Sequence, residues 1–232
     1  MNWHYLYLFL DLAAISVPFA FSFYKRANFS KQWQYLLPAI VLPGILFIVW
    51  DVYFTKWGIW GFNPAYLTGL NIVNLPVEEW MFFICIPYAC VFTYFAFGHL
   101  IEKDHLAKAQ RPISWTLIIA SLVIASLNTD KAYTATTFYS LALFLLLHIF
   151  VIKSNYLGRF YFAFIVILLP FFLINGVLTG SGIEDQVVWY NDNENLGIRM
   201  ITIPVEDTFY GMLLLMMNVT VFEELQNRVK KA

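Results

Sequence analysis

Seven apolar runs constrain the fold of this chain more than any other feature. They lie at residues 3–24, 35–54, 77–97, 112–128, 132–152, 160–179 and 203–222. A helix of about 20 residues crosses the roughly 30 Å hydrocarbon core of a bilayer, and only helices or closed barrels satisfy their backbone polar groups there. The sequence therefore predicts an all-α, polytopic membrane bundle with seven transmembrane helices.

The composition agrees with a membrane protein. Hydrophobic residues make up 60% of the 232 residues and charged residues only 12%, about half the charged share of a soluble domain. The 14 basic and 15 acidic residues nearly balance, which gives no indication of a nucleic-acid partner. We expect one membrane domain, residues 1–232, in an integral, multi-pass protein of the cytoplasmic (inner) membrane.

The basic residues predict the orientation of the bundle. Lys56, Lys131 and Arg199 fall on one side of the expected spans, and the remaining Lys and Arg residues fall on the other. Cytoplasmic connections carry the excess of Lys and Arg in membrane proteins. The amino terminus is therefore expected outside and the carboxyl terminus in the cytoplasm.

The chain contains an internal repeat. The segment Gly69–Glu79 aligns without a gap with Gly197–Asp207, at an offset of 128 residues, and Asn63 aligns with Asn191 at the same offset. Further upstream, Asp51 aligns with Asn175 if the second loop holds four additional residues. The sequence therefore predicts two related halves.

The repeat divides the expected domain into three parts. Residues 1–98 form the first three-helix repeat, residues 99–131 a connector with the fourth helix, and residues 132–232 the second repeat. Four helices separate equivalent positions, so both copies run in the same direction, as in membrane proteins with parallel repeats. We expect a parallel 3+1+3 arrangement that brings the outer ends of helices three and seven together.

Each copy places two carboxylates just after a proline: Glu78 and Glu79, and Glu206 and Asp207. The simplest interpretation is a helix start, where Pro76 or Pro204 suits the first turn and acids are favoured by the helix dipole. However, aromatic residues follow at once, so the acids lie at or just below the membrane interface. Ionisable groups at that depth usually face a cavity or a partner, and one of two close carboxyls can remain a neutral acid.

Other residues are weaker candidates. Asp51, Asn63 and Asn175 are expected to support the site, together with the neighbours of the acids, Pro76, Pro204, Trp80, Phe82, Phe83 and Tyr210. Asp11 is either part of the site or a structural hydrogen-bond partner, and His148 is interpreted as a satisfied intramembrane histidine. The segment with His99, Glu102, Asp104 and His105 is interpreted as a solvated charged loop rather than a metal site.

The sequence lacks the motifs of several classes of function. The chain has no GxGxxG, no GxxxxGK[ST], no HExxH and no Ser-His-Asp pattern, and the seventh run has no lysine for a retinal Schiff base. We expect no cofactor and no metal. The remaining interpretations are proton chemistry by carboxylic acids in an apolar pocket, or translocation.

Four segments resemble the membrane-embedded lycopene cyclases: Trp50-Asp51, Trp60–Pro64, Leu75–Phe83 and Ile203–Tyr210. These are the carotenoid cyclases of the heterodimeric bacterial type, here as a fused single chain similar to the archaeal form and to the cyclase half of the fungal bifunctional enzymes. The resemblance spans essentially the whole chain. Asp51 aligns with Asn175, and Glu79 aligns with Asp207, so the two copies of the repeat are not expected to share one role.

The resemblance implies a non-redox isomerase (intramolecular lyase) that converts the ψ-ends of lycopene to β-rings, giving β-carotene through γ-carotene. Our hypothesis assigns Glu78 and Glu206 as the leading acid/base candidates, with Glu79 and Asp207 tuning their protonation and Asp51 restoring protons. The expected partners are lycopene or a related carotenoid within the bilayer, and membrane lipids. A homo-oligomer, or an association with other carotenoid enzymes, also fits the resemblance.

Two alternatives stay open. One is a sister enzyme that acts on a C50 carotenoid or forms ε- or γ-rings, which differ in the proton lost from the same cation. The other is a small 3+1+3 membrane transporter. A transporter would need a polar path open to both sides, whereas the ionisable residues gather at the outer end.

Overall fold

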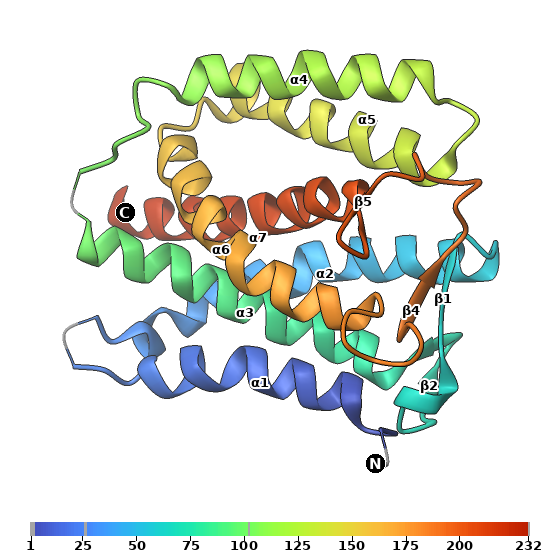
Figure 1. The fold of residues 1–232 in the computed structure, drawn as a ribbon. Helices are drawn as coiled ribbons and strands as arrows, with labels where there is room; N and C mark the ends of the chain where they lie inside the picture. Colours follow the sequence, from blue (N-terminus) through green and yellow to red (C-terminus); the bar gives the residue numbers. More distant parts are fainter. Residues whose placement is uncertain (1–2, 26, 102, 232) are drawn as a thin grey trace.

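The computed structural model describes residues 3–25, 27–101 and 103–231, and Glu102 of the charged loop lies outside these residues. Within them the chain forms seven α-helices (Figure 1). They are α1 (Leu6–Phe21), α2 (Trp33–Lys56), α3 (Val77–Leu100), α4 (Gln110–Leu127), α5 (Ala132–Leu147), α6 (Leu157–Leu178) and α7 (Val205–Lys231).

Short strands form three antiparallel pairs outside the helices. They are β1 (Trp60–Phe62) with β4 (Val188–Tyr190), β2 (Asn71–Ile72) with β3 (Leu75–Pro76), and β5 (Arg199–Met200) with β6 (Ile203–Pro204). All six lie at the end of the bundle that also holds the amino terminus, while the carboxyl terminus lies at the opposite end (Figure 1).

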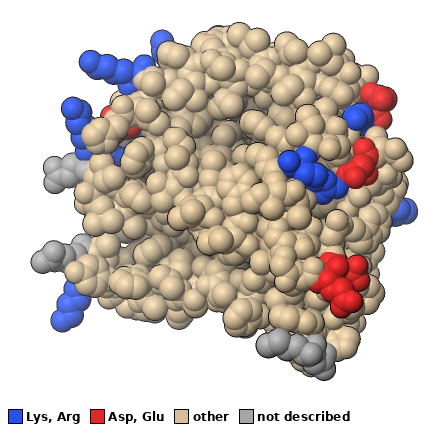
Figure 2. All heavy atoms as spheres, in the orientation of Figure 1, with Lys and Arg blue, Asp and Glu red and all other residues tan. Residues whose placement is uncertain are grey.

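The structure confirms the expected all-α membrane bundle. Six helices are long and apolar enough to cross a membrane, and α1 is a shorter apolar helix of 16 residues. In Figure 2 the charged side chains gather at the two ends of the molecule, and the surface between them is uncharged. Large apolar side chains such as Leu143 and Leu169 are exposed on that surface, which is the composition expected where a bundle contacts lipid.

The first helix is shorter than its apolar run predicts. The run covers residues 3–24, but α1 ends at Phe21 and contains Pro18 in its last turn. Proline removes a backbone donor and limits the helix around it. At 1.5 Å per residue, α1 is about 24 Å long, shorter than α2 and α3, which have 24 residues each.

Helices α3 and α7 form the centre of the bundle. Helix α1 packs on α3, α5 packs on α7, and α4 covers the outer side of α5. Helices α2 and α6 contact both central helices (Figure 1). The apolar core between them includes Leu36, Phe47, Val91, Phe160 and Phe222.

The hairpins before α3 and α7 have the same backbone conformation. The glycines Gly69 and Gly197 have φ of 85° and 69°, and Val73 and Ile201 have φ of 62° and 61°. Positive φ is rare for β-branched residues, so its occurrence at equivalent positions of both hairpins, 128 residues apart, indicates that the two hairpins share one conformation. Both helices therefore begin from an identical tight turn.

Strands β1 and β4 pair in a reciprocal way. The register joins Trp60 to Tyr190, Gly61 to Trp189 and Phe62 to Val188. Beyond the ladder, the Asn63 amide donates to the Val187 carbonyl, and the Asn191 amide donates to the Ile59 carbonyl, each at 2.8 Å. Each contact recurs at the offset of 128 with its partners exchanged, which is the pattern that a two-fold rotation produces.

Candidate active site

The first acid of each pair ties its helix to the preceding hairpin. The Thr68 amide donates to Glu78 Oε1 at 2.6 Å, and the Leu196 amide donates to Glu206 Oε1 at 2.8 Å. The Thr134 hydroxyl from α5 also donates to Glu206 Oε1, at 2.6 Å. Both carboxyls are fully buried, and neither lines the large cavity described below.

The second acid of each pair faces the inside of the bundle. One residue along a helix turns the side chain by about 100°, so Glu79 and Asp207 point away from the hairpins. The Tyr7 hydroxyl of α1 donates to Glu79 Oε2 at 2.5 Å. The Tyr133 hydroxyl of α5 donates to Asp207 Oδ1 at 2.6 Å, and the Tyr190 hydroxyl of β4 donates to Asp207 Oδ2 at 2.9 Å.

Asp51 of α2 lies beside Glu79. Its Oδ1 accepts hydrogen bonds from the Trp60 indole and, at 3.3 Å, from the Thr55 hydroxyl, while Oδ2 has no donor. The Asp51 and Glu79 carboxyls lie close enough to interact with each other. Two close carboxyls cannot easily both ionise, so a pair of this kind can keep one proton.

Asp207 has a different environment from Glu79. Its two oxygens each accept a tyrosine hydroxyl, and Asn175 stands where Asp51 stands beside Glu79. Burial and the adjacent Asp207 carboxyl raise the pKa of Tyr190 well above its ordinary value, so the Tyr190 hydroxyl keeps its proton and remains a donor. A hydrogen bond to a carboxylate oxygen stabilises its negative charge, and Asp207 accepts two of them, from Tyr133 and Tyr190.

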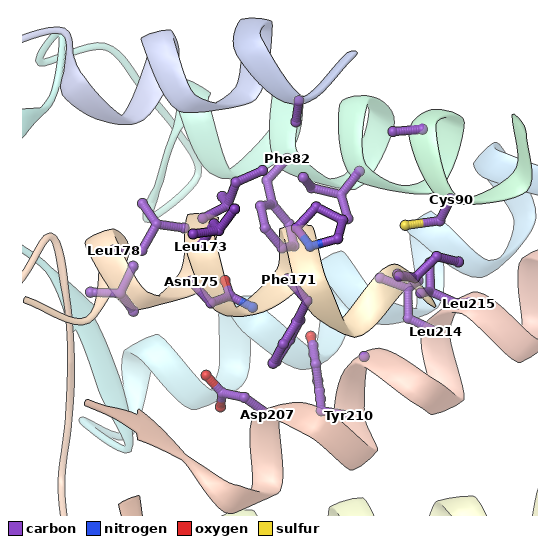
Figure 3. A pocket seen from close by; sticks show the side chains of 18 of the residues that line it. Phe82, Cys90, Phe171, Leu173, Asn175, Leu178, Asp207, Tyr210, Leu214 and Leu215 are labelled. Carbon is purple, nitrogen blue, oxygen red and sulfur yellow. The ribbon is translucent and has the colours of Figure 1, made fainter. Parts of the chain in front are cut away.

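Glu79 and Asp207 line one cavity of about 440 Å³. Figure 3 shows Asp207 and Tyr210 of α7 facing Asn175 and Phe171 of α6, with Phe82 of α3 across the cavity. Among the described residues that line it, no basic side chain occurs. The acids lie at the outer end, and the remaining walls are almost entirely apolar.

Two structures line the end of the cavity at which the acids lie. The β1–β4 ladder contributes Trp60 and Tyr190, which line the cavity directly. Beside it, an aromatic cluster joins α2, α5 and α7: the Trp60 ring lies 5.1 Å from Tyr133, and Trp50 lies 5.3 Å from Tyr210. Aromatic faces attract cations within about 6 Å, so these rings can stabilise positive charge near the acids.

The structure separates the other predicted residues into three groups. Phe82, Tyr210 and Asn175 line the cavity with Glu79 and Asp207, and Asp51 lies behind Glu79. Phe83 packs on Phe82 and Phe47, Trp80 donates to the Ile72 carbonyl at 3.3 Å, and Pro76 and Pro204 are buried in β3 and β6. None of these four lines the cavity.

Three further predicted residues lie elsewhere. Asn63 accepts from the Ala65 amide at 3.0 Å and lines a separate polar cavity at the outer surface. His148 bonds to Ser154 at 2.8 Å and Thr220 at 2.9 Å, so its interpretation as a satisfied intramembrane histidine agrees with the structure. Asp11 is fully buried, and neither of its oxygens has a partner among the described residues.

Sequence reasoning missed the tyrosines. Tyr7, Tyr133 and Tyr190 supply the three hydroxyls that bind Glu79 and Asp207. Tyr7 and Tyr133 occupy similar places near the outer ends of the first and fifth apolar runs. That coincidence was the available signal, but tyrosines are common near membrane interfaces and do not stand out there.

The chain is similar to a known protein family and to fungal proteins. A family model described as Lycopene cyclase matches residues 4–97 and 130–225. The chain is 24% identical over 103 residues to the bifunctional lycopene cyclase/phytoene synthase of Neurospora crassa, a match covering 40% of this chain and 17% of that protein. It is 27% identical over 84 residues to the protein of the same name from Aspergillus niger, covering 36% of this chain and 14% of that protein. No solved structure matches.

Proposed function

The chain belongs to the lycopene cyclase family, and from that premise we propose that it closes β-rings at the ψ-ends of lycopene. The product is β-carotene, formed through the monocyclic γ-carotene. The observation that carries the proposal is the pair of buried carboxyls, Glu79 and Asp207, that face one apolar cavity from two helix starts. The curated relatives are much longer than their matched segments, so their second activity is not carried over.

The reaction needs an acid and a base but no electron transfer. A proton adds to C2 of the terminal C1=C2 bond and leaves a tertiary cation at C1. The electrons of the C5=C6 bond then form the C1–C6 bond, which moves the positive charge to C5. Loss of the C6 proton forms the C5=C6 bond of the β-ring, so the atoms of the substrate are conserved.

We assign the proton donor to the Glu79–Asp51 pair. An alkene is a weak base, so its protonation needs an acid that is neutral, correctly placed and kept from water. A proton kept by this pair reaches the substrate through Glu79, which lines the cavity wall. The Trp60 and Thr55 donors stabilise Asp51 as the carboxylate once the proton has left.

We assign stabilisation of the cation, and acceptance of the C6 proton, to Asp207. Its two tyrosine donors favour a carboxylate, and an anion beside the cavity stabilises a carbocation electrostatically. The faces of Trp60 and Tyr210 add cation–π attraction. The β1–β4 ladder at this end of the cavity limits the access of water, which would trap the cation as an alcohol.

This assignment reverses the roles that the sequence suggested within each pair. The sequence favours Glu78 and Glu206 as the main acid/base residues, yet both accept hydrogen bonds from backbone amides at the hairpins and neither faces the cavity. We propose that they position the helix starts, and that Glu79 and Asp207 react.

We also propose the parallel 3+1+3 repeat with seven spans, the amino terminus outside and the carboxyl terminus in the cytoplasm. The hairpins and the β1–β4 contacts recur at one offset of 128. The family match falls in two segments, 4–97 and 130–225, that leave out α4, in agreement with boundaries at 98 and 132. The basic residues favour the cytoplasmic (inner) membrane and this orientation.

Expression in a bacterial host that accumulates lycopene tests the function. We expect the extracted pigment to become β-carotene, and a double variant Glu79→Gln, Asp207→Asn to leave lycopene unchanged while remaining in the membrane. A product with ε- or γ-rings would move the chain to a sister activity. Unchanged lycopene with abundant wild-type protein would contradict the proposal and point to a C50 substrate or a transporter.

A further inference from the structure

The cavity is much deeper than the reacting end of a substrate requires. Its wall on α3 extends from Glu79 to Thr93, a distance of about 21 Å at 1.5 Å per residue. Below the acids the wall is apolar, with Cys90 of α3 beside Leu214 and Leu215 of α7 (Figure 3). A long stretch of hydrocarbon therefore fits along the helix axes, behind the end that lies at the acids.

The walls of the cavity differ in exposure. On α3 and α7, Cys90, Leu214 and Leu215 are buried. On α1 and α6, the lining residues Val17 and Leu173 are 61% and 66% exposed. A residue that both lines a cavity and is exposed lies at its mouth, so the cavity opens sideways between α1 and α6.

The opposite side of the bundle is closed. At the offset of 124 residues that relates α2 to α6, Trp50 corresponds to Ile174 and Phe54 to Leu178. The two larger side chains pack into the aromatic cluster, with Trp50 at 5.3 Å from Tyr210 and Phe54 at 6.4 Å from Tyr133 of α5. On α6, Ile174 is smaller than the corresponding indole and lines the cavity on the side of α1.

We propose that this lateral opening, lined by Ala13, Ala14 and Val17 of α1 and by Phe171, Leu173 and Ile174 of α6, admits one end of a long polyene directly from the bilayer. The proposal rests on the proposed function for the identity of the chain. The opening lies within the uncharged belt of the surface (Figure 2), where an apolar chain is already dissolved. A chain held this way has one end at the acids while its remainder passes through the opening into lipid.

Tryptophan substitutions test the opening with a binding readout as well as a product readout. Ala13→Trp places an indole at the mouth, and Leu12→Trp places one on the same turn at an exposed position that does not line the cavity. On α6 the matched pair is Ile174→Trp, which installs the residue that the chain carries at Trp50, and Leu169→Trp, exposed and outside the lining.

Each substitution is made in wild type and in the Asp207→Asn background. In wild type, cyclic product per membrane protein is measured in lycopene-accumulating cells. In the Asp207→Asn background, the pigment retained by the purified protein is measured by absorbance. We expect Ala13→Trp and Ile174→Trp to lower both at least fivefold, and both control variants to stay within twofold of their parents.

The outcomes separate the opening from the function. The opening would be overturned if Ala13→Trp and Ile174→Trp retained as much pigment and made as much product as their parents. It would also be overturned if the Asp207→Asn parent retained no polyene, or if the two control variants lost as much as Ala13→Trp and Ile174→Trp. If wild type makes no cyclic product but the mouth variants alone lose the retained polyene, the opening stands and the cyclase assignment fails. Thermal unfolding of all four variants shows whether a loss comes from misfolding.

Discussion

The neighbouring acids Glu78 and Glu79 give the sharpest test of the proposed mechanism. The substitutions Glu78→Gln and Glu79→Gln are chemically identical, isosteric and one residue apart. Both carboxyls are buried, with exposed fractions of 0% and 8%. The structure nevertheless predicts opposite effects, because Glu78 faces the hairpin and Glu79 faces the cavity.

The expected magnitudes follow from what each amide can still do. In Glu78→Gln the side-chain carbonyl still accepts the Thr68 amide that now bonds at 2.6 Å. The other oxygen, Oε2, is buried without a partner among the described residues, so the amide nitrogen that replaces it is an unpaired donor, at a cost of about 1–3 kcal/mol in the free energy of unfolding. In Glu79→Gln the transferable proton is lost, and general acid catalysis contributes about 100- to 10,000-fold, equivalent to roughly 3–5 kcal/mol of activation free energy.

The assay is the initial rate of ring formation in isolated membranes, measured by chromatography and divided by the amount of folded protein. We expect Glu78→Gln to remain within a few-fold of wild type and Glu79→Gln to lose at least 100-fold. The corresponding pair in the second hairpin, Glu206→Gln and Asp207→Asn, should divide in the same way. A 100-fold loss in Glu78→Gln with normal abundance, together with an active Glu79→Gln, would refute the assignment and restore the order suggested by the sequence.

Three further predictions concern stability, pH and product order. A Cβ on Gly158 would lie 2.7 Å from backbone atoms of the connection before α4, so Gly158→Ala should lower the free energy of unfolding by about 1–3 kcal/mol. A Cβ on Gly44 meets open space, so the control Gly44→Ala should not lower the free energy of unfolding. Thermal unfolding in detergent measures both variants. Burial opposes a low pKa for Asp192, but hydrogen bonds from Arg199 and Asn195 lower its pKa below the ordinary value of 3.8. These bonds therefore make a small contribution to the free energy of unfolding above pH 3.8, which is lost as the pH falls through the pKa of the folded state. The stability difference between wild type and Asp192→Asn should accordingly shrink in acid. Because one cavity holds both reacting acids, limiting enzyme should accumulate γ-carotene before β-carotene in a time course, and β-carotene without the intermediate would contradict separate binding of the two ends.

The sequence alone predicted most of the architecture. Apolar runs at 77–97 and 132–152 correspond closely to α3 and α5, because continuous hydrophobicity over a bilayer thickness leaves few alternatives to a helix. The hairpin segments that begin at Gly69 and Gly197 share their positive φ angles as well as their sequence pattern. The exact end of α1 was less predictable, since apolar residues continue after Pro18.

The orientation of the acids could not be predicted from the sequence. Glu78 and Glu79 are adjacent, and which one faces the cavity depends on the rotation of α3 about its axis. The β2–β3 hairpin fixes that rotation through the Thr68 amide, ten residues away from Glu78. The tyrosine donors come from more distant segments, as Tyr7 is 72 residues from Glu79 and Tyr133 is 74 residues from Asp207, and no local pattern records such a contact.

The reciprocal pairing of β1 and β4 has a consequence for how the chain folds. Residues 60–62 are synthesised well before residues 188–190, and the packing of α2 on α7 and of α3 on α6 also joins segments that are far apart in the sequence. Loops of that length close slowly, so such contacts form late in folding. Strand β1 therefore stays unpaired, and the acid site stays incomplete, until the last helix has inserted into the membrane. Since each half depends on the other for these contacts, the two halves should unfold as a single cooperative unit.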